Sequence, residues 1–289
     1  MYSFKNTLKL LRIPFSFFLM PLFLLALSQE IHINLTTTII SFLIIHFLIY
    51  PASNGYNCYI DKDTESIGGI EHPPQPTKQL LYVTIFMDCF ALLLSVFLVN
   101  YFFALCILIY ILASKAYSSN QIRLKKHAFI GFLVVVVFQG AFTFYMSVIG
   151  ISGQPIDFTK ANAFILLACS FQIAGAYPLT QIYQHKQDAK EGVITLSYKL
   201  GYKGTFVFTM IMFVLCNVFY FLYFNDIKNV RNFYIVQLFF IPIVGYFMYW
   251  FYLVLKNKAN ANYKYTMAMN WIAATCMNLC FIILFFINH

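Results

Sequence analysis

Charged residues are scarce in this sequence: Asp, Glu, Lys and Arg make up only 10% of its 289 residues, whereas a soluble domain carries about 25%. Apolar and aromatic residues make up 61%, including 34 Phe and 21 Tyr. One soluble core of this length cannot bury so many rings. The shortage of charge therefore excludes a soluble globular domain and predicts a protein that crosses the membrane several times.

Acidic residues are the scarcer kind of charge, with ten Asp and Glu against nineteen Lys and Arg and a formal net charge of +9. In a soluble protein this excess would suggest nucleic-acid binding. In a membrane protein the position of each charge is more informative, and we expect neither nucleic acid nor a protein partner. The seven cysteines indicate small core residues rather than disulfides, because six of them lie in apolar segments.

Nine segments are apolar enough to cross a membrane, for which a helix needs about 20 mainly apolar residues. Unbroken apolar runs such as residues 132–138 differ from the alternating pattern of barrel strands. The sequence thus predicts an all-α bundle of nine transmembrane helices in a single domain, residues 1–289. The expected spans are 13–29, 34–56, 79–98, 99–116, 128–149, 162–184, 203–224, 231–255 and 265–287.

Basic residues concentrate on one side of this predicted bundle. With the N-terminus in the cytoplasm, 16 Lys and Arg fall on the inside and only three, Lys160, Lys228 and Arg231, on the outside. Cytoplasmic loops are enriched in Lys and Arg. We therefore predict an integral membrane protein, in the inner membrane if the cell is bacterial, with a cytoplasmic N-terminus and an external C-terminus. A cleavable signal peptide is the alternative for the first span, but Pro14 and Pro21 favour a retained helix.

Six of the ten acidic residues fall in two loops predicted to be cytoplasmic. In the first loop, Asn57, Asp61 and Glu65 are spaced by four, which predicts that the second span continues and presents all three on one helix face. Like charges at this spacing repel each other, and the helix C-terminus adds negative partial charge. The arrangement therefore calls for a bound cation.

The second loop repeats the pattern with Gln184, Asp188 and Gly192, predicted to extend the sixth span. The two motifs (residues 57–65 and 184–192) start 127 residues apart, each after a span, which indicates two pseudo-repeated halves. Oxygen-rich helix ends suit Mg²⁺, which binds one or two carboxylates together with substrate phosphates. A solvated cytoplasmic face would explain either motif alone, but their recurrence favours a site on the cytoplasmic side.

These two motifs resemble those of the UbiA superfamily of intramembrane prenyltransferases. Asn57, Asp61 and Glu65 are similar to the family's Asn-x-x-x-Asp-x-x-x-Asp, with Glu in the last place. The second family motif, Asp-x-x-x-Asp-x-x-x-Gly, has Gln184 at its first acid and Asp188 at its second. The resemblance covers nearly the whole chain. Further matching positions are Arg12, Tyr117–Ser118, Arg123–Lys125, Thr195–Leu196 and Leu200–Gly201.

The resemblance implies Mg²⁺-assisted transfer of a prenyl group from an isoprenoid diphosphate to a lipophilic acceptor, such as an aromatic quinone precursor, within membrane lipid. Asp61 and Asp188 would be catalytic, and Asn57, Asp61, Glu65, Gln184 and Asp188 would hold the metal. Basic loop residues and tyrosines near the motifs are the other substrate-binding candidates: Arg12, Lys78, Tyr117, Arg123, Lys125, Tyr177, Tyr183 and Lys186. Topology alone would also explain each basic one.

Two other functions stay open. Gln184 removes an expected charge from the metal site, which is compatible with a relative that binds prenyl lipids without catalysis. Asp88 lies in the middle of a predicted span, where an ionisable group is costly and often functional, as in transporters and ion carriers. Asp88 could instead orient an acceptor or bond to a neighbouring helix. Gln139, Gln172 and Asn217 are predicted to link helices.

Overall fold

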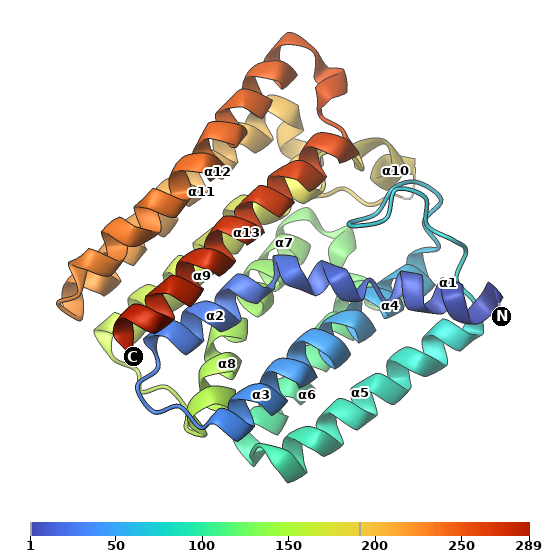
Figure 1. Ribbon diagram of the computed structural model, residues 1–289. Helices are drawn as coiled ribbons and strands as arrows, with labels where there is room; N and C mark the ends of the chain where they lie inside the picture. The colour runs from blue at the N-terminus through green and yellow to red at the C-terminus, as the bar shows by residue number, and fades with distance from the viewer. Residues whose placement is uncertain (1, 191) are drawn as a thin grey trace.

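A computed structural model of the chain describes residues 2–190 and 192–289, and its regular elements there are all helices (Figure 1). Eight helical spans among these residues are long and apolar enough to cross a membrane, and a bent pair of shorter helices forms a ninth. The predicted bundle of nine transmembrane helices is confirmed. The unbroken spans are α3–η2–α4 (Leu35–Asp61), α5 (Lys78–Leu98), α6 (Tyr101–Ser118), α7–η4–α8 (Ala128–Ser152), α9 (Lys160–Thr180), α11 (Leu196–Asp226), α12 (Val230–Lys256) and α13 (Tyr263–Asn288).

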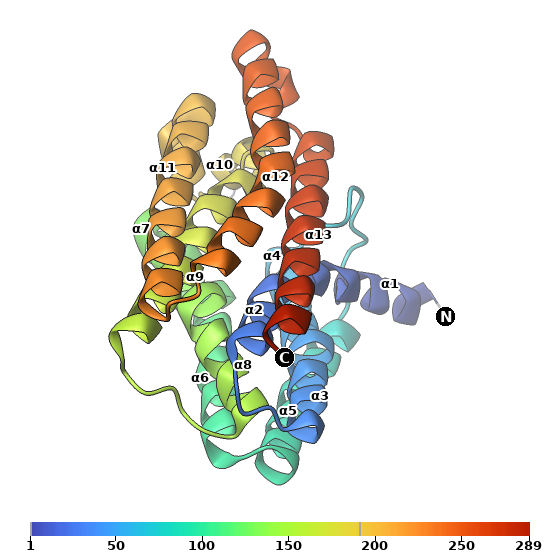
Figure 2. The same cartoon turned by 60° about the vertical axis from the view of Figure 1, so that its left-hand side comes forward.

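The first span is the broken one. Its first part, Phe4–Phe18, contains most of α1 (Tyr2–Leu10) and the 3₁₀ helix η1 (Ile13–Phe18). Its second part is α2 (Met20–Gln29), which is bent by 42° relative to the first. Proline has no backbone N–H and fits best in the first turn of a helix. Pro14 and Pro21 stand at these positions in η1 and α2, so each proline begins a new short helix. In Figure 2, α1 projects sideways from the bundle.

The sixth span also differs from the prediction, because α9 ends at Thr180 and does not continue to residue 184. Pro178 lies inside its last turn and removes a helix hydrogen bond there. A turn follows that contains Gln184, and Asp188 of the second motif lies on a separate short helix, α10 (His185–Lys190). The expectation that this motif extends the sixth span is therefore wrong.

The least distinct boundary in the sequence, between the third and fourth spans, is where it was predicted. Helix α5 ends at Leu98 and α6 starts at Tyr101. The Asn100 side chain caps α6 by accepting a hydrogen bond of 2.8 Å from the backbone N–H of Phe103. One capping residue is thus sufficient to turn the chain between two spans.

Two spans contain π-helical turns, η2 (Ile44–Ile49) and η4 (Val137–Ala141). Such turns rotate the residues that follow them and are frequent at functional sites. Gly140, within η4, allows a close helix approach, because a Cβ there would lie 2.7 Å from Ser170 Cα on α9. Phe138 and Gln139 of η4 line the site described below, so this turn and the close approach position part of its inner wall.

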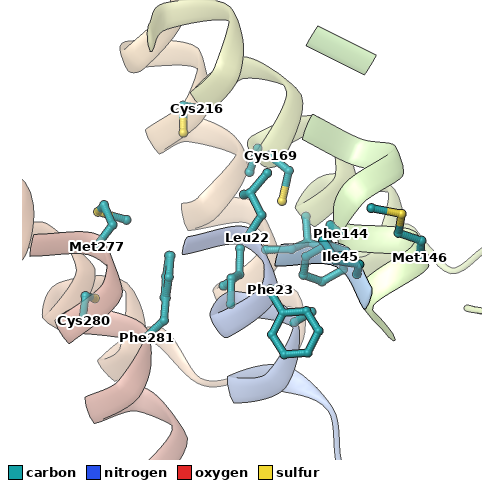
Figure 3. Close-up of a cluster of buried hydrophobic side chains, with 14 of the residues drawn as sticks. Leu22, Phe23, Ile45, Phe144, Met146, Cys169, Cys216, Met277, Cys280 and Phe281 are labelled. Carbon is teal, nitrogen blue, oxygen red and sulfur yellow. The ribbon is translucent and has the colours of Figure 1, made fainter. Parts of the chain in front are cut away.

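The bundle interior is packed with large side chains from α2, η2, α8, α9, α11 and α13 (Figure 3). Cys169, Cys216 and Cys280 are fully buried in this cluster, and every cysteine among the described residues is free. The prediction that the cysteines are core residues is confirmed for these three and for Cys106, which is also buried, but it is wrong for Cys89, which is exposed on α5.

Candidate active site

A cavity of about 300 Å³ opens at the end of the bundle where the two motifs lie. Its outer part is lined by acidic, amide and basic side chains of the motif segments and of η1 and η3 (Leu124–Lys126). Its inner part is lined mostly by apolar and aromatic side chains of η1, α6, α7, η4 and α9. The cavity therefore joins a charged mouth to a largely apolar interior.

The first motif lies only partly on α4 (Tyr50–Asp61). Asn57 and Asp61 share a helix face and line the cavity, but Lys62 has a left-handed backbone with φ 54° and ends the helix. Glu65 consequently does not stack above Asp61, and the predicted face of three side chains is wrong. Asp63 lines the cavity instead. Ending the helix here avoids stacking further negative charge on its C-terminus.

Asp61 is held between two basic side chains. Lys125 forms a direct ion pair with Asp61 Oδ2, and Arg123 Nη2 lies 3.8 Å from Oδ1. The side chain of Asp61 is only 6% exposed. Its Oδ1 has no hydrogen-bond partner among the described residues, although a buried polar atom normally finds one. The site therefore holds a desolvated carboxylate oxygen that is available to a ligand.

The second motif contacts the loop that carries the first. Gln184 Nε2 donates a hydrogen bond of 3.2 Å to the carbonyl of Ser66, and Gln187 Nε2 donates one of 2.8 Å to Asp63 Oδ1. The first bond uses the amide nitrogen of Gln184 and leaves its carbonyl oxygen for a ligand. Gln184 and Asp188 both line the cavity. The predicted convergence of the two motifs is thus present in the structure.

Helix α10 is anchored by His185, which is buried and stacks on the Tyr202 ring at 5.0 Å between centroids. Its Nε2 lies 2.8 Å from Ser197 Oγ on α11. Burial lowers the pKa of His185 to about 4, so the ring is neutral at pH 7. An uncharged histidine therefore fastens the second motif to the start of α11.

Tyrosines form one wall of the cavity. The hydroxyls of Tyr117 on α6 and Tyr177 on α9 are hydrogen-bonded to each other, and Gln181 Nε2 donates to Tyr177 at 2.9 Å. Tyr183 lies in the turn before α10, and burial raises the pKa of its phenol, against the opposing effect of nearby Arg12. All these phenols face the cavity as neutral hydrogen-bonding groups with ring faces available to a cation.

Arg12 also lines the cavity, at the junction of α1 and η1. Its guanidinium lies 4.1 Å from the centroid of the Phe15 ring, and its buried Nε has no hydrogen-bond partner among the described residues. Gly68 packs directly on this side chain, because a Cβ at Gly68 would lie 2.5 Å from Arg12 Nη2. The loop after α4 thus covers a cation that lines the cavity.

Several predicted site residues lie elsewhere. Glu65 is at the exposed rim, where Lys190 Nζ lies 3.6 Å from its Oε1. Lys78 is exposed at the start of α5 and does not line the cavity. The side chain of Lys186 lies outside the described part of the chain. Arg123 contacts Asp61 without lining the cavity.

The lining residues that were not predicted include four with carboxylate or amide side chains: Asn54, Asp63, Gln181 and Asn270. Asp63 belongs to the acidic loop and Gln181 lies one turn before Gln184. Their closeness in sequence to the motif residues could therefore have predicted both. Asn270 lies on the last span, and its sequence neighbourhood carries no signal. Only the packing of α13 beside η1 brings it to the cavity.

Asp88 does not line the cavity. Its Oδ2 lies 2.7 Å from Lys115 Nζ on the neighbouring helix α6. The sequence left three roles open for Asp88: an ion carrier, orientation of an acceptor, and a bond to a neighbouring helix. The structure contains the bond to a neighbouring helix. The carrier hypothesis rested on an ionisable Asp88 in the middle of a span, and its ion pair with Lys115 explains this position without ion transport. Gln172 and Asn217 link helices as predicted, through Tyr220 and Gln237 respectively.

Among the residues that the structure describes, no three His, Cys, Asp or Glu side chains lie close enough to form a metal site alone. The cavity instead offers separate carboxylates, Asp61, Asp63 and Asp188, with amides between them. Mg²⁺ prefers such partial protein sites, which the oxygens of a phosphate ligand and water complete.

The sequence model of the UbiA prenyltransferase family matches residues 16–273. This chain belongs to that family. It is accordingly an integral membrane protein with the UbiA prenyltransferase fold. A search of curated proteins found no match.

Solved structures share this UbiA fold. A UbiA homologue from Archaeoglobus fulgidus bound to DMAPP and Mg²⁺ is 16% identical, with a TM-score of 0.73 over 98% of this chain and 99% of that one. A UbiA homologue from Archaeoglobus fulgidus bound to GPP and Mg²⁺ is 17% identical, with a TM-score of 0.71 over 97% of this chain and 99% of that one. A digeranylgeranylglyceryl phosphate synthase is 20% identical, with a TM-score of 0.62 over 98% of each chain.

Proposed function

We propose that this UbiA-family protein transfers a prenyl group from an isoprenoid diphosphate to a lipophilic acceptor. The observation that carries the proposal is a single cavity with both motifs and their basic partners at its mouth and apolar side chains inside it. A diphosphate needs the first environment and a prenyl tail needs the second. One bound donor would thus occupy both parts at once.

The residues at the mouth fit Mg²⁺. Asp61 and Asp188 offer carboxylates, Asn57 and Gln184 offer amide carbonyls, and Asp63 lies beside them. Glu65 is not included, because it pairs with Lys190 outside the cavity. When bound, Mg²⁺ would offset the negative charge that develops on the departing diphosphate.

The protein's own side chains would serve both halves of the reaction. Lys125 and Arg123, already beside Asp61, and Arg12 at the junction of α1 and η1 place positive charge around the diphosphate. As the allylic C–O bond breaks, the ring faces of Tyr117 and Tyr177 stabilise the carbocation. The acceptor then bonds to the allylic carbon and loses a proton.

The acceptor would approach from the wall formed by η1 and α13. Phe15 and Phe18 supply aromatic surface there, and Asn270 supplies a hydrogen-bonding amide. This combination suits an aromatic, quinone-precursor-like acceptor that stacks on rings and carries a polar substituent. The site would face the cytoplasm, as the distribution of Lys and Arg predicts.

The test is diphosphate release and product formation by the purified protein in lipid nanodiscs, with geranyl diphosphate and a panel of phenols and aromatic acids. Asp61→Asn and Asp188→Asn should each lower turnover by about 100-fold, because each removes charge stabilisation in the transition state. Asp157→Asn, in an exposed loop, is the matched control and should leave turnover unchanged.

Turnover that survives both substitutions and the removal of Mg²⁺ would refute the proposal. Mg²⁺-dependent binding of the donor without any diphosphate release would instead identify a non-catalytic, prenyl-lipid-binding relative, the alternative that Gln184 suggests.

A further inference from the structure

The depth of the cavity is set by the helices that line it. On α6 the lining residues run from Ser118 at the mouth to Tyr110, and on α4 they run from Asp61 to Ser53. Each run spans eight residue-to-residue steps, which at a rise of 1.5 Å per step is about 12 Å. Two independent helices therefore give the same depth below the charged mouth.

A cluster of rings closes the inner end. The Tyr110 ring lies 6.0 Å from the Tyr50 ring and 6.3 Å from the Phe138 ring, between centroids. Tyr110 is 4% exposed and Tyr50 is 2% exposed. The Tyr50 hydroxyl lies 3.4 Å from Thr143 Oγ1, and Ile107, one turn below Tyr110, is fully buried. We call Tyr50, Tyr110 and Phe138 the ring floor.

A sideways exit toward lipid is also covered. The seam between η1 and α13 is spanned by Trp271, whose ring lies 5.0 Å from Phe18 and 5.3 Å from Phe17, between centroids. A long tail that cannot pass the ring floor would have to separate these rings. Neither direction therefore offers a tail a preformed path beyond the cavity.

The depth and the volume can be compared with the size of a prenyl tail. With carbon–carbon bonds of about 1.5 Å, a four-bond isoprene repeat extends about 5 Å, so about 12 Å holds two units. The cavity volume of about 300 Å³ includes the charged mouth that the diphosphate would occupy, so the part left for a tail is smaller than this value. The depth therefore gives a tail of about two units, and the volume leaves no room for a longer one.

We propose that the ring floor limits the donor to one or two isoprene units, with Tyr110 and Phe138 as the residues that determine specificity. The protein would accept dimethylallyl and geranyl diphosphate and discriminate against farnesyl and geranylgeranyl diphosphate. This inference rests on the proposed function, because it concerns the tail of the diphosphate that the same cavity binds.

The experiment measures the binding of unreactive prenyl thiodiphosphates with tails of one to four isoprene units to the full-length protein in nanodiscs with Mg²⁺. The wild type should bind the two-unit analogue at least about tenfold more tightly than the three- and four-unit analogues. Tyr110→Ala and Phe138→Ala should each tighten binding of the three-unit analogue by about tenfold and leave one-unit binding unchanged.

The matched controls are Tyr101→Ala on α6 and Phe129→Ala on α7, which make the same truncations at positions that are 79% and 62% exposed. Neither control should change the length preference. If Tyr110→Ala does not fold, Phe138→Ala carries the test, because Phe138 is only partly buried.

Equal binding of the four-unit and two-unit analogues by the wild type would overturn the length limit, as would a length preference that neither ring-floor variant changes. Because binding is read without turnover, this failure is distinct from failure of the proposed function. If the protein binds short tails but releases no diphosphate, the length limit is supported and the proposed activity is refuted. If it turns over geranylgeranyl and geranyl diphosphate equally well, the activity is supported and the length limit is refuted.

Discussion

The ion pair between Asp88 on α5 and Lys115 on α6 allows a quantitative test of how charge is buried in this bundle. The two side chains are 11% and 22% exposed, and their charged atoms are 2.7 Å apart. Lys115 also lies 4.1 Å from the centroid of the Tyr56 ring on α4. Replacing Asp88 with Asn leaves the Lys115 charge between three spans without its carboxylate.

Removing one partner of a buried ion pair costs about 3–5 kcal/mol of folding free energy. The partial exposure of Lys115 and its contact with the Tyr56 ring reduce this cost, since a cation over a ring is worth about 1–2 kcal/mol. We therefore expect Asp88→Asn to lower the free energy of unfolding by about 2–3 kcal/mol. Lys115→Met should have a similar effect, because it leaves the Asp88 charge alone.

The double variant is the informative one. Asp88→Asn with Lys115→Met removes both charges, and exchanging a whole buried pair for uncharged groups is close to neutral, so its stability should lie within about 1 kcal/mol of the wild type. The assay is reversible unfolding in mixed micelles, followed by tryptophan fluorescence, for the two single variants and the double variant. Asp157→Asn serves as the exposed control.

A double variant whose loss equals the sum of the two single losses would refute the reasoning, because the charges would then contribute independently. A single Asp88→Asn variant as stable as the wild type would refute it as well, because it would show that water or lipid headgroups already solvate Lys115.

Two further substitutions test the mouth of the cavity. Gly68→Ala should displace the Arg12 side chain and weaken the binding of geranyl thiodiphosphate by about tenfold, which corresponds to a loss of about 1.4 kcal/mol. Gly245→Ala, the control, adds a Cβ in open space and should leave binding unchanged. Equal effects of the two variants in a binding titration would contradict this prediction. Lys125→Met should lower turnover by about 100-fold, because it removes a buried cation from the diphosphate site. Lys190→Gln removes a cation from an exposed pair and should change turnover less than about twofold; the reverse order of the two effects in a steady-state assay would contradict the proposed roles.

The sequence by itself determined the membrane class, the nine spans and the two motif segments. These features depend on local properties: hydrocarbon thickness sets the length of an apolar run, and Asn100 ends one helix and caps the next within a few residues. Motif residues one turn apart, such as Asn57 and Asp61, share a helix face wherever the helix packs. The approach of the two motifs could also be inferred from the sequence, because each follows a span and is predicted to lie on the same side of the membrane.

The tertiary structure alone decided which charged side chains meet and where the cavity ends. Spacing suggested that Glu65 belongs to the site, but the left-handed Lys62 turns the chain and brings Asp63 to the cavity. Asp88 finds its partner 27 residues away on another span, and the ring floor combines Tyr110 with Phe138 from a third. The physical reason is that helix formation depends on neighbours within a few residues, whereas ion pairs and cavity walls depend on the rotation and depth at which whole helices pack.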